Sequence, residues 1–385
     1  MCATGCATYD SPLYLTPEER AEPASLVTGD PAPPVVAGEW LRGPPVTAYE
    51  PGTVYVIDFW SSWCGPCLAS LPLLDELVMR HQGRVVAVAV TRIEEDNSPS
   101  NIRRTARELF PTDSSVRVAI DSSDASTRAF RSAVRDAALP RTFIVDQHGR
   151  LAWWGHPVDA APIVDAVLAE RWDLDAARQA DLEAARQRAL SNRLVQQYIA
   201  AINRGDKTAA LDAARGVCSV PVNRTDGMSP PWWAWPTRVG LLVRLDRHAE
   251  AEAVAREAGD LPGIRDEPVA LSELVTALDA GRKADPSTAR LRLDLARRAM
   301  ELVDAGEART PANSWEQYMH DAEYRQNGSV MVSASDALAD DGQIEAAKAL
   351  LSRAIARWSD DPRLVPSKTT LKARLAALES LPLAQ

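Results

Sequence analysis

The pattern of hydrophobic and polar positions divides the chain into two parts. Between residues 30 and 172, short runs of β-branched and aromatic residues alternate with stretches of helical periodicity. From about residue 175, Ala, Arg, Leu, Glu and Asp recur with helical periodicity and strand signals almost disappear. The first pattern predicts an α/β domain and the second an all-α domain. We expect an N-terminal extension at 1–28, an α/β domain at 29–173 and a helical domain at 174–385.

The α/β part is expected to form a mixed central sheet flanked by helices. The run Val54–Trp60 is almost continuously apolar, which is typical of a strand buried on both faces. After an edge strand or hairpin in residues 30–45, the predicted strands are Val54–Trp60, Arg84–Val90, Val116–Ile120, Leu139–Asp146 and Leu151–Trp154. The predicted helices are 68–83, 100–110, 124–136 and 158–171. A tight turn at Asp146–Arg150 closes the sheet with an antiparallel hairpin.

The helical part is expected to consist of helical hairpins. Two helices share residues 175–218, and a Pro- and Trp-rich linker follows at 219–236. Further helices are predicted at 237–258, 267–282, 286–305, 312–325, 329–340, 343–358 and 367–381. Residues 245–252 and 341–351 each resemble half of a tetratricopeptide-type repeat, without a regular period. This domain either binds a protein partner or caps the first domain, and its Trp cluster at 232–235 is either an interaction site or core.

Composition and charge narrow the function classes. The formal net charge is −10, and no basic stretch stands out, so we expect no nucleic-acid binding. The longest apolar runs are too short for a membrane span. The first thirty residues lack the basic start and apolar core of a signal peptide. The sequence as it stands predicts a cytoplasmic protein, and the alternative is the periplasm if a leader precedes it.

Five cysteines are too few for a disulfide scaffold in a chain of this length. Cys64 and Cys67 are the only tight pair inside a well-patterned segment. Cys2 and Cys6 are expected to have no role, and Cys218, at a helix end, to be a buried small apolar residue. The five histidines show no ligand spacing, and we expect neither a metal site nor a cofactor.

The segment Trp63–Cys67, WCGPC, follows a buried strand and precedes a helix, and it resembles the redox motif of thioredoxin. The resemblance extends over most of residues 29–173. Asp58 lies six residues before Cys64, in the strand, and matches the buried acid of that family. Pro140 precedes a strand and matches the family's cis-proline, which faces the two sulfurs. The resemblance implies a thioredoxin-like fold and thiol–disulfide exchange.

One branch of this superfamily is the most similar. The stretch between the cysteines and Pro140 is longer than in a minimal thioredoxin, as in the TlpA/ResA-like disulfide reductases. The run Leu139–Pro157 also resembles that branch. Those reductases usually carry a Glu three residues after the second cysteine, where this chain has Ser70, although Pro72 matches. We therefore assign the acid of this protein to Asp58.

The chemistry expected of the pair follows from its position at a helix N-terminus. There the unpaired N–H groups and the helix dipole favour an anion, so the pKa of Cys64 should fall. Cys67 lies one turn later and is expected to be more buried. Gly65 and Pro66 form the spacer, and proline is tolerated in the first helical turn. Cys64 would attack a substrate disulfide, and Cys67 would then resolve the mixed disulfide.

Three further residues complete the expected site. Burial should raise the pKa of Asp58 toward neutrality, so that it could accept the proton of Cys67 directly or through water. Pro140 would offer a flat wall without an N–H donor, beside which the main chain of a substrate could pair. Trp63 would shield the sulfur and shape the contact surface.

Other interpretations of the motif remain open. A lone CxxC can be half of a zinc site, but the sequence contains no second CxxC or CxxH. The pair could also be a structural disulfide. A peroxidase would need Thr and Pro at set distances before the cysteine, and Ser61 and Ile57 occupy those places.

We therefore predict a thiol–disulfide oxidoreductase that reduces protein disulfides, because Gly-Pro is the spacer of the reducing protein thioredoxin. Its partners would be a client protein with a disulfide, an upstream thiol electron donor and a protein bound by the helical domain. The alternative is a redox-gated helical scaffold with little catalytic turnover.

Overall fold

The computed structural model describes residues 24–81, 83–110, 112–136, 138–221, 233–279, 286–307, 310–358 and 365–380. Cys2, Cys6 and most of the expected extension at 1–28 lie outside these residues. The chain divides into two compact units between Arg193 and Leu194, and each unit is described by itself. In the described residues, no helix is both long and apolar enough to cross a membrane.

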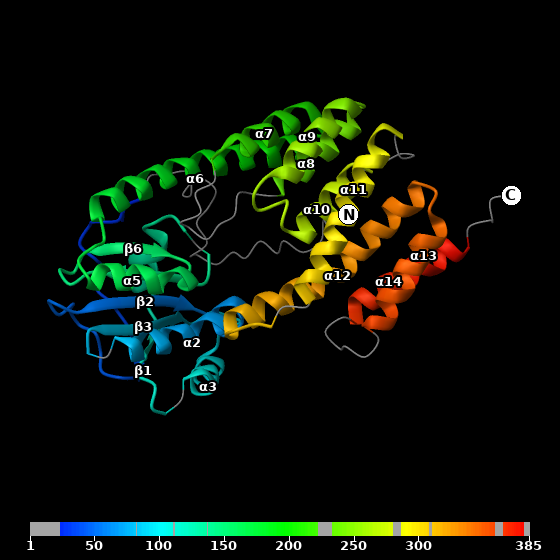
Figure 1. Cartoon of the computed structure of the whole chain (residues 1–385). Helices are drawn as coiled ribbons and strands as arrows, with labels where there is room; N and C mark the ends of the chain where they lie inside the picture. Colours follow the sequence, from blue (N-terminus) through cyan, green and yellow to red (C-terminus); the bar gives the residue numbers. More distant parts are fainter. Residues whose placement is uncertain are drawn as a thin grey trace. The chain divides into compact units, whose positions relative to one another are not determined.

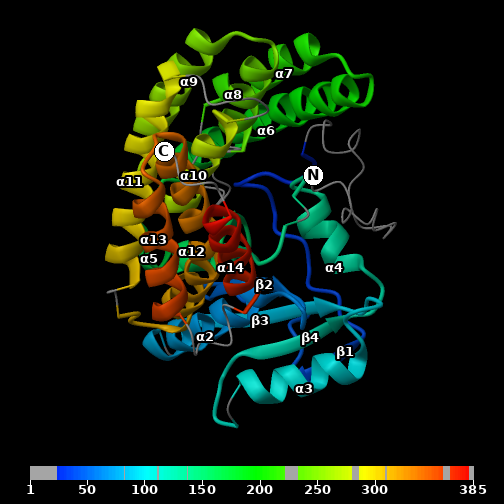
Figure 2. The ribbon, with the colours of Figure 1, turned by 90° about the vertical axis from the view of Figure 1, so that its right-hand side faces the viewer.

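The first unit contains a mixed sheet, which has six strands in the described residues, in the order β1-β4-β3-β2-β5-β6 (Figures 1 and 2). The strands are β1 Glu39–Arg42, β2 Val54–Trp60, β3 Val85–Arg92, β4 Arg117–Asp121, β5 Arg141–Val145 and β6 Leu151–Gly155. The central strand β2 runs parallel to β3 and antiparallel to β5. All seven residues of β2 are buried, as its continuous apolar run predicts.

The two faces of the sheet are covered by different helices. One face packs against α2 Gly65–Arg80, α3 Pro99–Leu109 and α5 Ala160–Leu168, and α5 follows the 3-10 turn η2 Pro157–Asp159. The other face packs against residues that include Phe130 and Val134, which lie in and just after the π-helical turn η1 Arg128–Ser132, preceded by the short helix α4 Ala125–Thr127. Side chains alternate along each strand, so Val54, Val56 and Trp60 pack on the α2 side.

Residues beyond the predicted end of the α/β domain also belong to the first unit. The helix α6 spans Leu174–Asn203, and its first half carries Asp181. Asp181 Oδ1 accepts a hydrogen bond from Trp154 Nε1 at 3.1 Å, and Oδ2 accepts one from the backbone N–H of Thr28 at 2.9 Å. The guanidinium of Arg188 lies 4.8 Å from the centre of the Trp154 ring. These contacts place the end of the compact unit within α6, at Arg193.

We predict that Asp181→Ala destabilises the first unit by about 1–3 kcal/mol, because the buried N–H groups of Trp154 and Thr28 lose their acceptor. The measurement is thermal unfolding followed by near-ultraviolet circular dichroism. Glu183→Ala on the same helix is the control, because Glu183 is exposed. Equal effects of the two substitutions would contradict the prediction.

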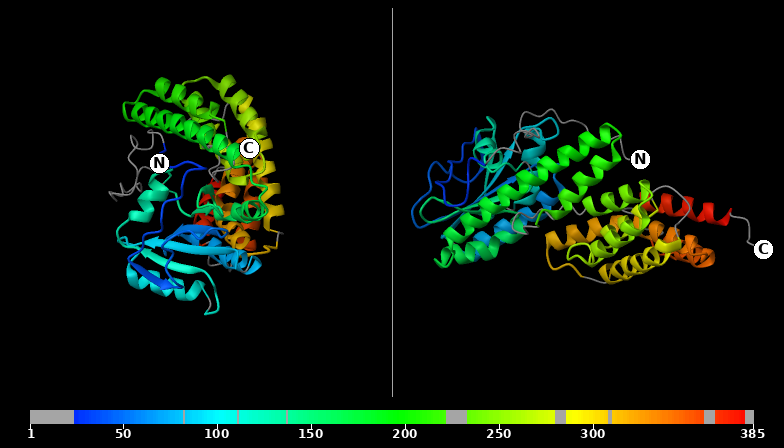
Figure 3. Two further views of the ribbon diagram at one scale, coloured as in Figure 1. Left: turned by 90° about the vertical axis from the view of Figure 1, so that its left-hand side faces the viewer. Right: turned by 90° about the horizontal axis from the view of Figure 1, so that it is seen from above.

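The second unit is helical (Figures 1 and 3). After the second half of α6 it contains α7 Lys207–Ser219, α8 Ala234–Arg244, α9 His248–Asp260, α10 Pro268–Ala277, α11 Pro286–Glu307, α12 Ser314–Asp340, α13 Ile344–Arg357 and α14 Val365–Glu379. Successive helices pack on one another: α8 contacts α7 and α9, α11 contacts α10 and α12, and α13 contacts α12 and α14. Tight turns with positive φ at Gly205 and Gly342 separate neighbouring helices. The expected helical hairpins are therefore present.

Three helix predictions in this unit were wrong. The helices expected at 312–325 and 329–340 are one helix, α12, which continues through Gly328. Packing of α12 against four other helices outweighs the cost of about 1 kcal/mol for a glycine inside a helix. The stretch 237–258 is broken by a turn at Asp246, where φ is +58°. The helix α8 begins at Ala234, inside the expected linker, because a proline is tolerated in the first turn.

The tryptophans are mostly internal. Trp153 and Trp154 lie on opposite faces of the sheet and are both buried. In the cluster at 232–235, Trp235 belongs to the core of the helical unit, and Trp233 lies 5.7 Å from Tyr198, measured between ring centres. Trp232 is outside the described residues. Of the two described tryptophans of the cluster, Trp235 is therefore buried in the core, and Trp233 is half-buried.

Candidate functional site

Cys64 and Cys67 form a disulfide at the start of α2, the helix that follows the central strand β2. Their Cα atoms lie 5.2 Å apart. Cys64 is the N-cap of the helix, and its Sγ accepts a hydrogen bond from the backbone N–H of Cys67 at 3.3 Å. Pro66 lies in the first turn, where its missing N–H costs no helical hydrogen bond. The dipole and the unpaired N–H groups of this helix end stabilise negative charge on the Cys64 sulfur.

The two cysteines differ in their access to solvent. Cys64 is 5% exposed and Cys67 is 0% exposed. Cys67 packs with Leu71 and Leu74 in the core beneath α2. Within the pair, only Cys64 can therefore meet a molecule from outside without a change in structure.

Asp58 is a fully buried carboxylate in the middle of β2. Strand alternation places its side chain on the same face as Val56 and Trp60, which share a core cluster with Cys67. Its Oδ1 accepts a hydrogen bond from Thr142 Oγ1 at 2.5 Å, and its Oδ2 has no hydrogen-bond partner among the described residues. Burial raises the pKa of Asp58 to about 7, although the hydrogen bond from Thr142 lowers it. The carboxyl can therefore exchange a proton near neutral pH.

Pro140 lies immediately before β5, and the Leu139–Pro140 peptide bond is cis. Strands β5 and β2 are antiparallel, with Arg141 opposite Phe59 and Thr142 opposite Asp58. Pro140 is therefore next to the end of β2 from which the cysteine loop departs.

Trp63 precedes Cys64 and is 47% exposed, although it is a large aromatic residue. Its indole Nε1 donates a hydrogen bond to Glu94 Oε2 at 3.1 Å. Glu94 also pairs with Arg92, at the end of β3. Glu94, in the loop after β3, thus holds the exposed ring of Trp63.

Asn97 is a residue that the sequence analysis missed. It is 0% exposed, and its Oδ1 accepts hydrogen bonds from the backbone N–H of Ser62 at 2.9 Å and from Ser62 Oγ at 2.6 Å. Its Nδ2 donates to Thr91 Oγ1 at 3.0 Å and to the Arg92 carbonyl at 2.6 Å. Asn97 therefore ties the loop before Cys64 to the end of β3, and the sequence offers no motif for this link.

Two further residues of the first unit, Ser70 and His156, have buried or half-buried polar side chains. Ser70, at the position where TlpA/ResA-like reductases usually carry Glu, is buried and donates a hydrogen bond to the Cys67 carbonyl at 3.1 Å. A hydroxyl at this place leaves Asp58 as the buried acid on the α2 side of β2. His156, just after β6, is kept neutral because burial and the charge of Arg141 lower its pKa to about 4.

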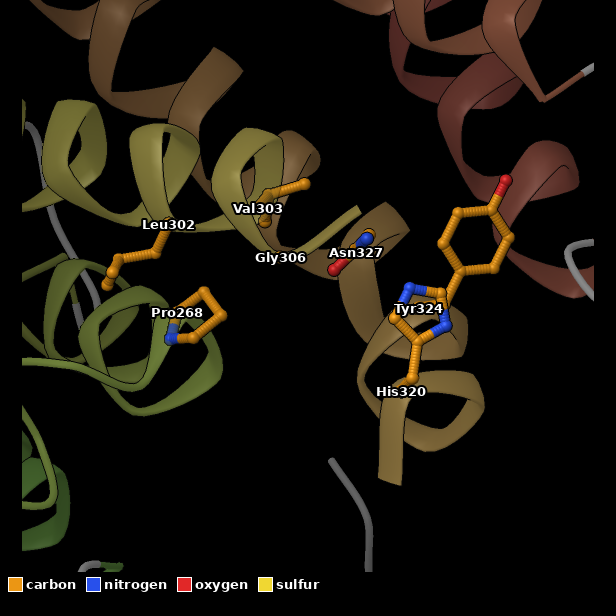
Figure 4. A pocket seen from close by; sticks show the side chains of 7 residues that line it. All are labelled: Pro268, Leu302, Val303, Gly306, His320, Tyr324 and Asn327. Carbon is orange, nitrogen blue, oxygen red and sulfur yellow. The ribbon is translucent and has the colours of Figure 1, made fainter. Parts of the chain in front are cut away.

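The helical unit contains two further features of chemical interest, the free thiol of Cys218 and a small pocket. Burial raises the pKa of Cys218 to about 11, so this half-buried thiol is a poor nucleophile at neutral pH. A small pocket in the helical unit is lined by Pro268, Leu302, Val303, Gly306, His320, Tyr324 and Asn327 (Figure 4). The rings of His320 and Tyr324 stack along one side of it, and no cysteine lines it. Among the described residues, no group of His, Cys, Asp and Glu is arranged to hold a metal ion.

Comparison with known proteins finds a family match within the first unit. The family model described as Redoxin matches residues 28–168. Protein FixW of Rhizobium leguminosarum is 29% identical over 157 residues, which cover 39% of this chain and 69% of FixW. Thioredoxin of Thiocapsa roseopersicina is 35% identical over 57 residues, which cover 15% of this chain and 59% of that thioredoxin. Residues 28–168 form a Redoxin domain of the thioredoxin superfamily.

Solved structures give similar matches. A thioredoxin-like protein solved in solution in its oxidized form is 28% identical, with a TM-score of 0.32, over 37% of this chain and 97% of that chain. A protein disulfide isomerase of Bacteroides thetaiotaomicron, named as putative, is 18% identical, with a TM-score of 0.32, over 38% of this chain and 93% of that chain. The Redoxin match, the thioredoxin-like sheet and the Cys64–Cys67 disulfide are consistent with a thiol–disulfide oxidoreductase.

Proposed function

We propose that this protein reduces disulfides in client proteins through Cys64 and Cys67. The observation that carries the proposal is a disulfide at the N-cap of α2, with one sulfur reachable from solvent and a buried carboxyl whose pKa is about 7 in the adjacent strand. The Gly-Pro spacer supports the reducing direction, because it is the spacer of thioredoxin, whose potential is about −270 mV.

In the reaction that we propose, the Cys64 thiolate attacks one sulfur of the client disulfide. A bond forms between Cys64 Sγ and that sulfur, and the other client sulfur leaves as a thiolate that takes up a proton. Cys67 then loses its proton to Asp58, and its thiolate attacks Cys64 Sγ. The Cys64–Cys67 disulfide forms, the second client thiolate leaves, and two electrons have passed to the client. An upstream thiol donor, in the cytoplasm or the periplasm, must return the pair to the dithiol.

The remaining residues would prepare the surface on which the client docks. Pro140 lacks an N–H, so it offers a wall on which a client main chain can lie without a competing donor. Trp63 supplies an exposed aromatic face directly before the nucleophile. The helical unit would hold a protein partner, and its succession of hairpins is an architecture suited to that role.

Insulin reduction with dithiothreitol as the electron donor tests the proposal. We expect the full chain to accelerate precipitation of the insulin B chain well above the rate with dithiothreitol alone. A rate equal to that of the dithiothreitol blank would refute the reductase. If the chain instead formed partner complexes that depended on the oxidation state, the redox-gated scaffold would be favoured.

A further inference from the structure

A group of buried and half-buried charges lies at the base of the redox loop and has no part in the proton and sulfur chemistry described above. Its members are Arg92 at the end of β3, Glu94 in the loop after β3, Arg131 in the turn η1, Asp136 in the loop before β5 and Arg141 at the start of β5. Ionised side chains are rarely buried unless each is paired, because desolvation of a charge is costly. The partners of these charges are therefore informative about what the group holds in place.

One half of the group fixes the loop that carries Pro140. Arg141 Nε and Nη2 both contact Asp136 Oδ2, at 2.8 and 2.7 Å, and both side chains are buried. The other oxygen, Asp136 Oδ1, accepts a hydrogen bond from the backbone N–H of Ala138 at 2.7 Å. Arg141 Nη1 also donates to the Pro140 carbonyl at 3.5 Å. A single carboxylate thus joins both ends of the segment Asp136–Arg141, and Pro140 lies inside that segment.

The other half of the group fixes Trp63. One Glu94 oxygen accepts the indole N–H at 3.1 Å, and the other pairs with the guanidinium of Arg92. Arg92 in turn lies 3.5 Å from Asp124, measured from Nη1 to Oδ1. The exposed ring of Trp63 is therefore anchored to a charge pair whose cation is only 7% exposed.

The charge of Arg131 interacts with both halves of the group. It belongs to the π-helical turn η1, and its backbone carbonyl accepts a hydrogen bond from the N–H of Asp136 at 3.1 Å. Burial lowers the pKa of Arg131 to about 10, and the charges that act on it are those of Asp136, Arg92, Glu94 and Arg141. Its side chain therefore senses both the pair at the Pro140 loop and the pair at Trp63.

We propose that these charges form one brace that fixes both walls of the redox site, Pro140 and Trp63, and that Asp136 and Glu94 are positioning residues for client docking. The inference rests on the proposed function. Walls that are already ordered lower the entropic cost of binding a large client. A small disulfide reaches Cys64 without using either wall, so its reaction should not depend on the brace.

The protein offers a matched control for Asp136. Asp146, at the other end of β5, pairs with Arg150 in the same way, with its Oδ2 2.9 Å from Nε and 2.8 Å from Nη2. Its Oδ1 likewise accepts backbone N–H groups of its own loop, and the two carboxylates are similarly buried. Asp136→Asn and Asp146→Asn therefore remove pairs of the same geometry at opposite ends of β5, although the arginine side chain is 3% exposed in the first pair and 45% exposed in the second.

The experiment measures kcat and KM for insulin, and the rate constant for 2-hydroxyethyl disulfide, with the full chain. For Asp136→Asn we expect the insulin KM to rise about fivefold or more, as when a binding surface is misplaced, with the small-disulfide rate within about twofold of wild type. For Asp146→Asn we expect both quantities within about twofold of wild type, since its loop contacts no substrate.

Glu94 tests the second wall and keeps the inference falsifiable if Asp136→Asn does not fold. Glu94→Ala should raise the insulin KM, and Glu94→Gln, which keeps an acceptor for the Trp63 indole, should recover part of the loss. If the charges form one brace, each single substitution already disturbs both walls. The fold increase in insulin KM for the double variant Glu94→Ala/Asp136→Asn should therefore be much smaller than the product of the two single fold increases.

The outcomes separate the brace from the proposed function. A wild-type chain that reduces 2-hydroxyethyl disulfide but not insulin, or neither, would refute the proposed reductase itself. If wild type reduces insulin and Asp136→Asn behaves like Asp146→Asn, or Glu94→Ala leaves KM unchanged, the brace is overturned. If the fold increases in KM of the two single variants multiply in the double variant, the two walls have independent supports, and the brace is likewise overturned.

Discussion

Cys64→Ser should abolish insulin reduction and bring the rate down to that of dithiothreitol alone. A serine hydroxyl does not ionise near neutral pH and forms no bond with a disulfide sulfur, so neither the mixed disulfide nor the later steps can occur. The measurement is the initial rate of insulin precipitation with the full-length variant. The helix N-cap should survive, because serine is itself a favoured N-cap residue.

Two further cysteine variants sharpen this prediction. Cys67→Ser should still attack the client disulfide through Cys64 but cannot resolve the mixed disulfide, so a covalent complex between Cys64 and the client should accumulate, visible on a non-reducing gel. Cys218→Ser should reduce insulin at the wild-type rate, because the thiol of Cys218 is half-buried and its pKa is about 11. Residual insulin reduction by Cys64→Ser, or loss of activity in Cys218→Ser, would contradict the assignment of the nucleophile.

Asp58→Asn should slow turnover on the order of tenfold to a hundredfold at pH 7, at the lower end of what general bases contribute. Burial raises the pKa of Asp58 to about 7, so its carboxylate form, which accepts the Cys67 proton, increases as the pH rises through this value. The wild-type rate should therefore rise with an inflection near pH 7, and the variant should lack it. If the inflection in the pH–rate profile persists in Asp58→Asn, the titrating group is not Asp58.

The same substitution should stabilise the oxidised protein in alkaline solution. The pKa of Asp58 is about 7 in the folded state against an ordinary value of 3.8, so the folded state binds more protons between these pH values and its stability falls as the pH rises. At pH 8 the difference of about three pKa units between the folded and unfolded states lowers the free energy of unfolding by about 4 kcal/mol at most. Below pH 3.8 Asp58 is protonated in both states, and no difference remains.

Hydrogen exchange of the β2 amides, corrected for its intrinsic pH dependence, measures this effect in the first unit alone. Asp58→Asn should protect β2 more than wild type does at pH 8, and the two proteins should converge toward pH 4. Asn keeps an acceptor for the hydroxyl of Thr142, so the packing around residue 58 changes little. If wild type and Asp58→Asn are equally protected at pH 8, ionisation of Asp58 does not destabilise the folded state, and the prediction is wrong.

The sequence alone was sufficient for the parts of the fold and site that depend on local patterns. The strand β2 was predicted with its observed bounds, because an uninterrupted run of β-branched and aromatic residues has few alternatives to a buried strand. Cys64 was expected at a helix N-terminus, and Asp58 was expected to be buried with a pKa near neutrality. The Leu139–Pro140 bond is cis, as the family resemblance implied.

The features that the sequence analysis missed depend on contacts between distant segments. Asn97 is joined to Ser62 across 35 positions of the chain, and neither residue belongs to a motif. Thr142, the partner of Asp58, can be found only from the antiparallel register of β5 and β2. The unbroken α12 likewise depends on its packing against four helices, which a local count of helix-breaking residues cannot include. The catalytic roles of Cys64, Cys67, Asp58, Pro140 and Trp63 stay predictions.

The reduction potential of the Cys64–Cys67 couple tests the central claim most directly. The full chain would be equilibrated with a series of dithiothreitol or glutathione redox buffers, and its free thiols would then be alkylated and counted by mass. We predict one two-electron transition at or below about −250 mV, the range of thioredoxin-like reductases. A value above about −180 mV would instead indicate an oxidant or isomerase, and the absence of any two-electron transition would leave the pair a structural disulfide.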